Sequence, residues 1–499
     1  MTLQLRRHDV MLQPDISRVI IRPFIPSNSH QVSNMIGRIL SLSEEEAGRE
    51  LDIILADFAS RHGNLEARLM DHFRVIQPKI FTQRPLSRTR QLLIGALFSG
   101  EYALESAALF NPSIVPHPDQ TGVAEGCLRF IMSLRATGEG HISSIEFRSG
   151  LIAKDGAITL DPVSRHVSLA EVEPNPTYRK KLFIIKLSEM GFDCNATEPG
   201  YAGEVMKPLA ENFTLRELDN RVRNVRHLHR PEPRDLKHTL ECIHWLAVSN
   251  YELHFDPALS LSERAIFPVS PNESNGIEDA RFVRFTEQAG GESATGQPAG
   301  GVMYYATYTA YNGRVILPQL IETQDFLHFR ILTLNGNAVQ NKGMALFPRR
   351  IDDRYAMLSR QDDENLFIMF SDNPHYWNDP QLLLRPAEIW ESVKIGNCGS
   401  PIETEAGWIV LTHGVGPMRK YCLGAVLLDL ADPAKVIGRL REPLILPEGM
   451  GREGYVPNVV YSCGSLKHGR ELILPYAMSD RVSVIVSVSI GELLAAMAV

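Results

Sequence analysis

A short polar turn, Asn-Gly-Ile-Glu-Asp-Ala-Arg at residues 275–281, places two adjacent carboxylates and a guanidinium directly before an apolar segment. Glu278 and Asp279 are neighbours, so in an extended strand we expect their side chains on opposite faces, with different environments and pKa values. One carboxyl group can then transfer a proton while the other supports it. Arg281 would share a face with Asp279 and keep it ionised unless burial or a neighbouring carboxylate raises its pKa. A solvated surface turn with an ion pair is the alternative.

Tyrosines are dense in the next segment, residues 303–313, which has a strand pattern that ends in a turn signal. Tyr308 and Tyr311 in this segment, and Tyr421 further on, could stack on sugar rings while their hydroxyls bond sugar hydroxyls. About half of such tyrosines would instead lie in the core, because neighbours in a strand face opposite ways.

Further motifs follow in a fixed order: Asn341-Lys342-Gly343, Leu358-Ser359-Arg360, Gly399-Ser400-Pro401-Ile402-Glu403, Leu411-Thr412-His413-Gly414-Val415-Gly416 and Tyr455-Val456-Pro457-Asn458-Val459-Val460. Together with the turn, they resemble glycoside hydrolase family 130, from about Phe110 to about Asp480. That family contains mannoside phosphorylases and fewer mannosidases, built on a five-bladed β-propeller. The resemblance implies a mainly β fold with this propeller at residues 103–499, whereas the strand pattern alone predicts only many short strands.

Helical patterns occur in two places outside the expected strands. Residues 1–102 form a helical N-terminal region, with helices predicted at 41–58, 65–76 and 88–110. A helical insertion at about 174–236 contains a predicted helix at 215–228, after which strands are expected to resume at His238. Strands are also predicted at 128–135 and 142–147, with a hairpin turn at 154–156.

The resemblance assigns roles by position. Asp279 matches the general acid of an inverting mechanism, in which the proton is thought to pass through a hydroxyl of the mannose itself. Many relatives have proline where this chain has Ala280. Amide and guanidinium donors suit adjacent sugar hydroxyls, and the expected sugar-binding residues are Asn111, Arg135, Glu278, Arg281, Tyr308, Tyr311 and Tyr421.

Phosphate requires cationic or N–H donors aimed at one point. By family position the candidates are Lys342, Arg360 and His413. Glu403 argues the other way, because phosphorylases of the family commonly carry a lysine there and hydrolytic relatives use glutamates. Glu403 is therefore an alternative base for activating water, or a structural residue paired with Arg419 or Lys420.

Composition excludes several classes of function. The 499 residues carry a net charge of -8 without a long basic run, so no nucleic-acid partner is expected. The N-terminus has no apolar leader and no segment could span a bilayer, which predicts a cytoplasmic protein that does not bind membranes. The six cysteines form no metal-binding pattern, so no metal or cofactor is expected. The family resemblance implies inorganic phosphate as a co-substrate.

Together these features predict an inverting phosphorylase that converts β-mannosides to α-mannose 1-phosphate. The long chain with its N-terminal helices is most similar to members that act on β-1,2-mannooligosaccharides. The alternatives are an inverting β-mannosidase on the same substrates and a non-catalytic propeller that binds glycans. The oligomeric state is left open, a homo-oligomer included.

Overall fold

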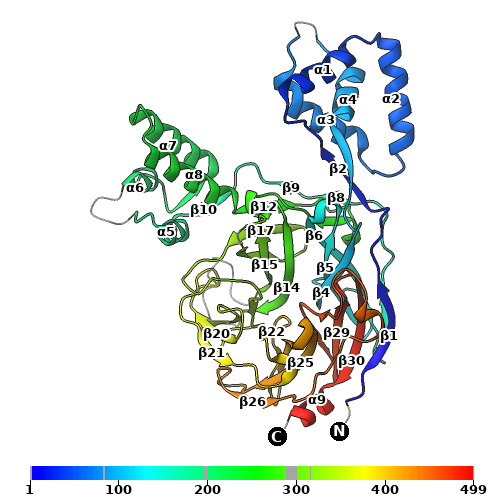
Figure 1. Ribbon diagram of the computed structural model, residues 1–499, viewed down its shortest axis with the longest axis vertical. Coiled ribbons are helices and arrows are strands. Elements are labelled where there is room, and N and C mark those ends of the chain that lie inside the picture. The colour runs from blue at the N-terminus through cyan, green and yellow to red at the C-terminus, as the bar shows by residue number, and fades with distance from the viewer. Residues whose placement is uncertain (1–2, 83–84, 195–199, 288–300, 315, 498–499) are drawn as a thin grey trace.

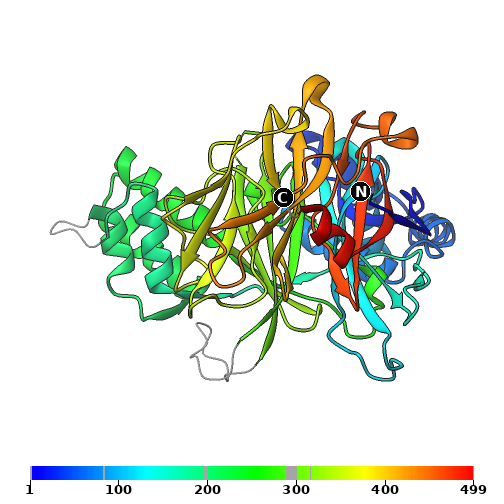
Figure 2. The same cartoon turned by 90° about the horizontal axis from the view of Figure 1, so that it is seen from below.

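The computed structural model describes residues 3–82, 85–194, 200–287, 301–314 and 316–497, and this part of the chain is mainly β. Its strands form several antiparallel sheets arranged around a common centre, and two groups of helices project outward from them (Figure 1). The view from below shows the insertion helices on one side and the N-terminal helices on the other (Figure 2).

The largest sheet has twelve strands and contains two antiparallel meanders, β4-β5-β6 and β14-β15-β16-β17, joined by a short parallel contact between Gly276 and Ser143. Its strands are β4 (Ala108–Pro116), β5 (Leu128–Thr137), β6 (Ser143–Ile152), β7 (Ile158–Leu160), β8 (Ser168–Leu169), β9 (Glu171–Val172), β12 (Tyr251–His254), β13 (Arg264–Ile266), β14 (Gly276–Thr286), β15 (Val302–Tyr311), β16 (Ile316–Thr323) and β17 (His328–Thr333). The predicted strands at 128–135 and 142–147 are confirmed as β5 and β6.

Three more sheets complete the ring. One contains β18 (Ala345–Leu346), β19 (Tyr355–Ser359), β20 (Leu366–Ser371) and β21 (Gln381–Leu384). The next contains β22 (Lys394–Asn397), β23 (Ile402–Thr404), β24 (Gly407–Val415), β25 (Tyr421–Leu428) and β26 (Val436–Arg439). In the last, β27 (Val460–Tyr461), β28 (Leu466–His468), β29 (Glu471–Met478) and β30 (Val482–Ser489) are joined by β1 (Arg6–Leu12), which pairs with β30. The short helix α9 (Ile490–Met497) follows.

The N-terminal helices stand on a ribbon of β2 (Val19–Pro23) and β3 (Ser99–Ala103). They are α1 (Ser29–Leu40), α2 (Glu44–Phe58), α3 (Leu65–Ile76) and α4 (Arg88–Leu97), which confirms the helices predicted at 41–58 and 65–76. Ser43 and Glu46 form a capping box at the start of α2. The prediction of a helix over 88–110 is wrong beyond Leu97. Residues 99–103 form β3, and the apolar residues from Ala108 belong to β4, which is buried on both faces and shows no alternation.

The insertion contains α5 (Lys180–Glu189), α6 (Gly200–Met206), α7 (Leu215–Leu228) and α8 (Arg234–Val248), with the ribbon β10 (Thr177–Arg179) and β11 (Asn212–Thr214). Helix α7 is where the sequence predicts it. The expectation that strands resume at His238 is wrong, since α8 buries Leu236, Leu240 and Ile243 at helical spacing in the insertion's own core. Strands resume at Tyr251. None of the helices in the described ranges is long and apolar enough to cross a bilayer.

Candidate active site

Two β-bulges bring the predicted acid and the predicted asparagine together. The β4–β5 pairing shifts between Phe110 and Ser113, and the β14–β15 pairing shifts between Glu278 and Arg281. Asn111 and Asp279 lie in these bulges with φ angles of 50° and 56°, a left-handed conformation that Asn and Asp adopt more readily than most residues. The Asn111 amide donates a hydrogen bond to Asp279 Oδ1 at 2.7 Å. Both side chains are therefore fixed before any ligand binds.

Arg135 contacts both carboxylates of the turn. Its Nη2 lies 2.7 Å from Glu278 Oε1 and its Nη1 lies 3.3 Å from Asp279 Oδ1. The expectation that Glu278 and Asp279 point to opposite faces is wrong, because the bulge removes Asp279 from the regular alternation of β14. The guanidinium also lies over the ring of Phe110, with Cζ 5.0 Å from the ring centroid.

The charge of Asp279 depends on its cationic neighbours. Burial alone would raise the pKa of Asp279, but the charges of Arg135 and Lys342 and the Asn111 hydrogen bond hold that pKa below its ordinary value. Without a ligand, the carboxyl group of Asp279 is thus ionised at neutral pH, as the sequence predicts for a carboxylate beside arginine.

Asp480 is a third carboxyl group at this site, and the sequence interpretation missed it. It lies in the turn after β29 with a φ of 50°. Burial and the nearby charge of Asp279 raise the pKa of Asp480 to about 7, against the opposing effect of Arg135. Its only sequence signal is its position where the family resemblance ends, since nothing in its local sequence indicates a partner so far away in the chain.

Asp480→Asn is expected to stabilise the protein more at pH 8 than at pH 5. The folded state binds a proton at Asp480 more tightly than the unfolded chain, so this group's contribution to stability falls as the pH rises from about 4 to about 7. Unfolding temperatures at both pH values test this. Asp353→Asn is the control, because Asp353 is exposed and has a similar φ of 60°. An equal difference between Asp480→Asn and wild type at both pH values would contradict the assignment.

Arg281 and Lys342 supply positive charge beside Asp279. Arg281 is 2% exposed and donates to the Asn397 carbonyl oxygen at 2.9 Å, to the Asn397 side chain, and to the Tyr461 hydroxyl at 2.7 Å. Lys342 Nζ is 3.7 Å from Glu278 Oε2, and its side chain remains 39% exposed. Arg281 is thus a fixed charge, whereas Lys342 can move toward a ligand.

Arg360 and His413 form a buried pair next to this group. Arg360 Nη1 is 3.1 Å from His413 Nε2, and His413 Nδ1 is 3.2 Å from the Asn397 carbonyl oxygen that also accepts from Arg281. Burial and the charges of Arg360 and Arg281 lower the pKa of His413 well below its ordinary value. In the neutral ring, these partners assign the hydrogen to Nδ1 and leave Nε2 to accept from Arg360. His413 therefore positions Arg360.

The predicted tyrosines take different places. Tyr308 is buried, and its hydroxyl lies 2.5 Å from both Glu273 Oε1 and Gln319 Oε1, so its polar tip is used inside the protein. Tyr421 stacks on His413 with ring centroids 6.1 Å apart. Tyr311 is partly exposed and pairs with Gly276 at the start of β14. The structure adds Tyr461, which the sequence interpretation did not select.

Glu403 lies elsewhere. It forms an ion pair with Arg349 at 2.7 Å, in place of the pairing with Arg419 or Lys420 considered from the sequence, and lines a separate depression together with Arg284. Arg284 lies five positions after Asp279 on β14, or about 15 Å along a strand. Close to this depression, the backbones at Gly399 and Cys463 are in tight contact: a Cβ at Gly399 would lie 2.4 Å from the Cys463 carbonyl oxygen. The structure does not bring Glu403 to the site of Asp279.

Glu403→Gln is expected to leave kcat and KM within about twofold of wild type, because Glu403 lines a depression separate from the pocket of Asp279. The variant should also stay folded, since a partly exposed ion pair contributes at most ~1 kcal/mol to stability. Steady-state kinetics of the purified variant measure this. A loss of activity comparable to that of an Asp279 variant would show that Glu403 acts in the reaction.

Among the described residues, no group of three or more His, Cys, Asp or Glu side chains is arranged to hold a metal ion. The site is instead a cluster of cations, Arg135, Arg281, Lys342 and Arg360, around the carboxyl groups of Glu278, Asp279 and Asp480. Such a cluster can bind an anion next to an acid.

Comparisons with known proteins identify mannoside phosphorylases as relatives of this chain. The model of the family described as beta-1,4-mannooligosaccharide phosphorylase matches residues 299–498. A 1,2-beta-oligomannan phosphorylase from Thermoanaerobacter sp. is 35% identical over 233 residues, 43% of this chain and 70% of the relative. A beta-1,2-mannobiose phosphorylase from Listeria innocua is 30% identical over 46% of this chain and 62% of the relative.

The chain belongs to glycoside hydrolase family 130, and it is a glycoside phosphorylase or glycoside hydrolase of that family. Among solved structures, the Listeria innocua beta-1,2-mannobiose phosphorylase in complex with beta-1,2-mannobiose shares 21% identity, with a TM-score of 0.46 over 79% of this chain and 93% of that one.

Proposed function

We propose that the protein cleaves β-mannosides, in particular β-1,2-linked mannooligosaccharides, with inorganic phosphate and releases α-mannose 1-phosphate with inversion. The observation that carries this proposal is the group of cations, Arg281, Lys342 and Arg360, beside the partly buried Asp279. The names of the relatives support the same reaction and linkage. The cytoplasmic location expected from the sequence is part of this proposal.

The fold proposed for this reaction is a five-bladed β-propeller at residues 103–499. The sheets support five blades: β4–β7, β14–β17 with β12, β18–β21, β22–β26, and β27–β30 with β1. Residues 1–102 are then an N-terminal region that contributes β1 to the last blade. The insertion, expected at about 174–236, extends through α8 to Val248.

Phosphate binding and the proton of Asp279 are linked in this mechanism. A phosphate dianion between Arg281, Arg360 and Lys342 would add negative charge near Asp279 and so offset the positive charges that keep it ionised. This raises the pKa of Asp279. The acid therefore gains its proton when the nucleophile is bound, and inversion follows if phosphate attacks from the face opposite the leaving group.

The mannose is proposed to bind beside Asn111 and Arg135. Asn111 Oδ1 is buried and has no hydrogen-bond partner among the described residues, so it can accept from a sugar hydroxyl. Arg135, held by Glu278 and Asp279, offers donors in a fixed plane. Tyr421, stacked on His413, provides an aromatic face nearby.

Asn111→Ala is expected to raise the KM for the mannoside about tenfold, because a buried hydrogen-bonding group that loses its partner costs ~1–3 kcal/mol. The KM for phosphate should change little. A fall in kcat as well would show that Asn111 also orients Asp279 in the transition state. Unchanged kinetics for both substrates would place Asn111 outside the sugar site.

Hydrolysis is the alternative reaction for this family. Its sequence support was Glu403, which forms an ion pair with Arg349 and lines a different depression from the pocket of Asp279. The proposal is tested by incubating the purified protein with β-1,2-mannobiose or β-1,4-mannobiose, each with inorganic phosphate, and measuring mannose 1-phosphate. Faster release from the β-1,2 isomer is expected. Release from neither isomer would contradict the proposed function, and preference for the β-1,4 isomer would contradict the linkage.

A further inference from the structure

A second cavity, which shares no lining residue with the pocket at Asp279, lies between the insertion and the twelve-stranded sheet. We call it the seam cavity. Its empty volume is about 500 Å³, part of which is open solvent at its mouth, so it can hold several waters or one small molecule. It is lined by Thr177, Tyr178, Arg179, Leu182, Phe183 and Lys186 from the insertion, Leu246 and Asn250 at the end of α8, and Arg330, Leu332, Thr333, Asn335 and His375 from the ring.

Two buried polar atoms in the wall of this cavity, Asn335 Oδ1 and His375 Nδ1, have no hydrogen-bond partner within the described ranges. Asn335 is 3% exposed, and its amide donates to the carbonyl oxygens of Thr333 and His375, which leaves Oδ1 unpaired. His375 is also 3% exposed, and its Nε2 lies 2.6 Å from Glu322 Oε1. Its Nδ1 is unpaired and is an acceptor in the neutral ring. Unpaired buried acceptors are costly, so this wall fits a ligand or water that donates hydrogen bonds.

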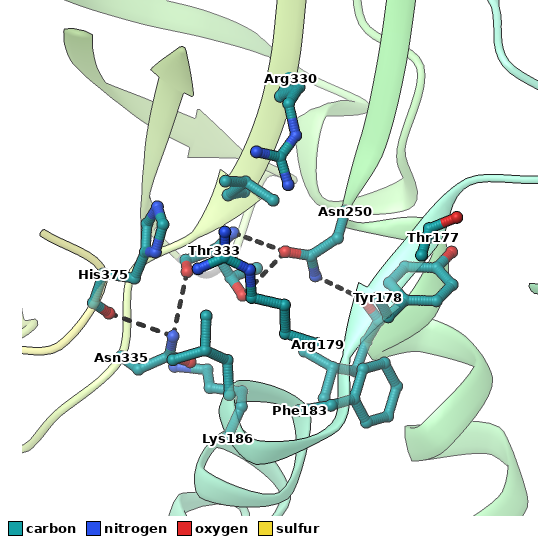
Figure 3. Close-up of a pocket in the computed structure, with 13 residues that line it drawn as sticks. Thr177, Tyr178, Arg179, Phe183, Lys186, Asn250, Arg330, Thr333, Asn335 and His375 are labelled. Carbon is teal, nitrogen blue, oxygen red and sulfur yellow. Dashed lines mark hydrogen bonds between the residues drawn. The ribbon is translucent and has the colours of Figure 1, made fainter. Parts of the chain in front are cut away.

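Donors face these acceptors across the cavity. Figure 3 shows Arg330 above, Lys186 below, and the Arg179 side chain between Asn250 and Asn335. Leu182, Leu246 and Leu332 add apolar surface. The combination of donors, acceptors and an apolar wall matches a sugar ring, whose hydroxyl groups both donate and accept while its C–H faces are apolar.

Charge balance argues for a neutral ligand. Carboxylates outside the lining contact Lys186 and Arg330: Glu189 Oε2 is 3.2 Å from Lys186 Nζ, and Glu322 Oε2 is 3.1 Å from Arg330 Nη1. Glu252 lies 3.6 Å from Arg330 as well. The positive charge of the cavity is thus largely compensated, and a phosphate dianion would gain little there.

The wall of the cavity is held in place before a ligand binds. Glu189 of α5 accepts a hydrogen bond from the backbone N–H of Gly336, next to Asn335. Gly336 has a φ of 109°, and a Cβ there would lie 1.9 Å from the Trp377 carbonyl oxygen. The backbone at Gly336 therefore packs tightly against Trp377. A preformed cavity loses less entropy on binding than one that must be ordered.

From this geometry we propose that the seam cavity is a second carbohydrate site, which binds one neutral hexose unit between the insertion and the ring. The choice of mannose as the hexose rests on the proposed function, whereas the existence of the site does not. The site predicts that one chain binds two mannose molecules, one beside Asn111 and one in the seam cavity.

Titration of the full-length protein with mannose, followed by ligand-observed NMR and calorimetry, tests the proposal. Lys186→Ala is expected to weaken the seam site about tenfold or more, and Leu182→Trp to block it by bulk. Lys181→Ala is the matched control, because Lys181 is exposed on the same helix and does not line the cavity. Asn111→Ala should weaken binding about tenfold at the other site only. Circular dichroism checks that each variant is folded.

A single mannose per chain, bound more weakly in Asn111→Ala and unchanged in Lys186→Ala and Leu182→Trp, would overturn the proposal. Binding of inorganic phosphate that depends on Lys186, without binding of mannose there, would overturn it as well. Failure of phosphorolysis with two intact mannose sites would refute the proposed function alone, so the two outcomes are distinguishable.

Discussion

Asp279→Asn is expected to lower kcat by ~10²–10⁴-fold, the usual contribution of a general acid, while the protein still folds and binds mannoside. The amide keeps the shape of the side chain but cannot donate a carboxylic proton. Asn is also well suited to the left-handed backbone at this bulge, so little strain is introduced. Steady-state kinetics with saturating phosphate and mannoside measure the effect.

Glu278→Gln is the matched control for this prediction, because Glu278 is adjacent to Asp279 and contacts the same guanidinium of Arg135. It should be milder, since Glu278 orients Arg135 and Lys342 and does not transfer the proton. Near wild-type turnover in Asp279→Asn would refute its role as the acid, and equal losses in the two variants would mean that the roles are wrongly divided.

Arg360→Ala is expected to raise the KM for phosphate by roughly ten- to a hundredfold, with a much smaller effect on the KM for mannoside. A hydrogen bond between charged groups contributes ~1.5–3 kcal/mol, which converts to this range. Arg360 is buried, held by His413 and Asp363, and follows the end of β19, so its direction is fixed.

Arg354→Ala provides the comparison for Arg360→Ala. Arg354 is exposed just before the other end of β19, over the ring of Phe370, and removing it takes away one positive charge of the same type from the same strand region. It should leave both KM values unchanged. Equal effects of the two substitutions on the KM for phosphate would show that Arg360 acts only through general electrostatics.

The residue types at the site were predictable, but the geometry that unites them was not. The motifs that contain Asn111, Arg135, Asp279 and Lys342 lie far apart in the sequence, and the structure gathers these residues within one contact network. The bulges at Asn111 and Asp279 were not predicted, because a local pattern of strand residues does not reveal a shift in pairing with a distant strand. For this reason Glu278 and Asp279 are expected on opposite faces from the sequence, whereas both contact Arg135.

Other differences arise from tertiary contacts. Glu403 ends a motif that lies close in sequence to His413, one of the predicted phosphate-binding residues. In the structure it lies in β23 and forms an ion pair with Arg349. The alternation of β15 turns the side chain of Tyr308 into the core, where its hydroxyl donates a hydrogen bond to Glu273. The local sequences around Asn397, Tyr461 and Asp480 are ordinary, so only the structure shows their contacts. Asn397 contacts Arg281 and His413, and Tyr461 contacts Arg281. Asp480 lies near Asp279, whose charge raises its pKa.

The most direct test of the proposed reaction is to follow β-1,2-mannobiose with the wild-type protein by ³¹P and ¹H NMR, with and without inorganic phosphate. If phosphate held by Arg281, Lys342 and Arg360 is the nucleophile, α-mannose 1-phosphate should be the first product, formed as fast as the disaccharide disappears, and no cleavage should occur without phosphate. Free mannose released at the same rate in both samples would contradict phosphorolysis and show that water is the nucleophile at this site.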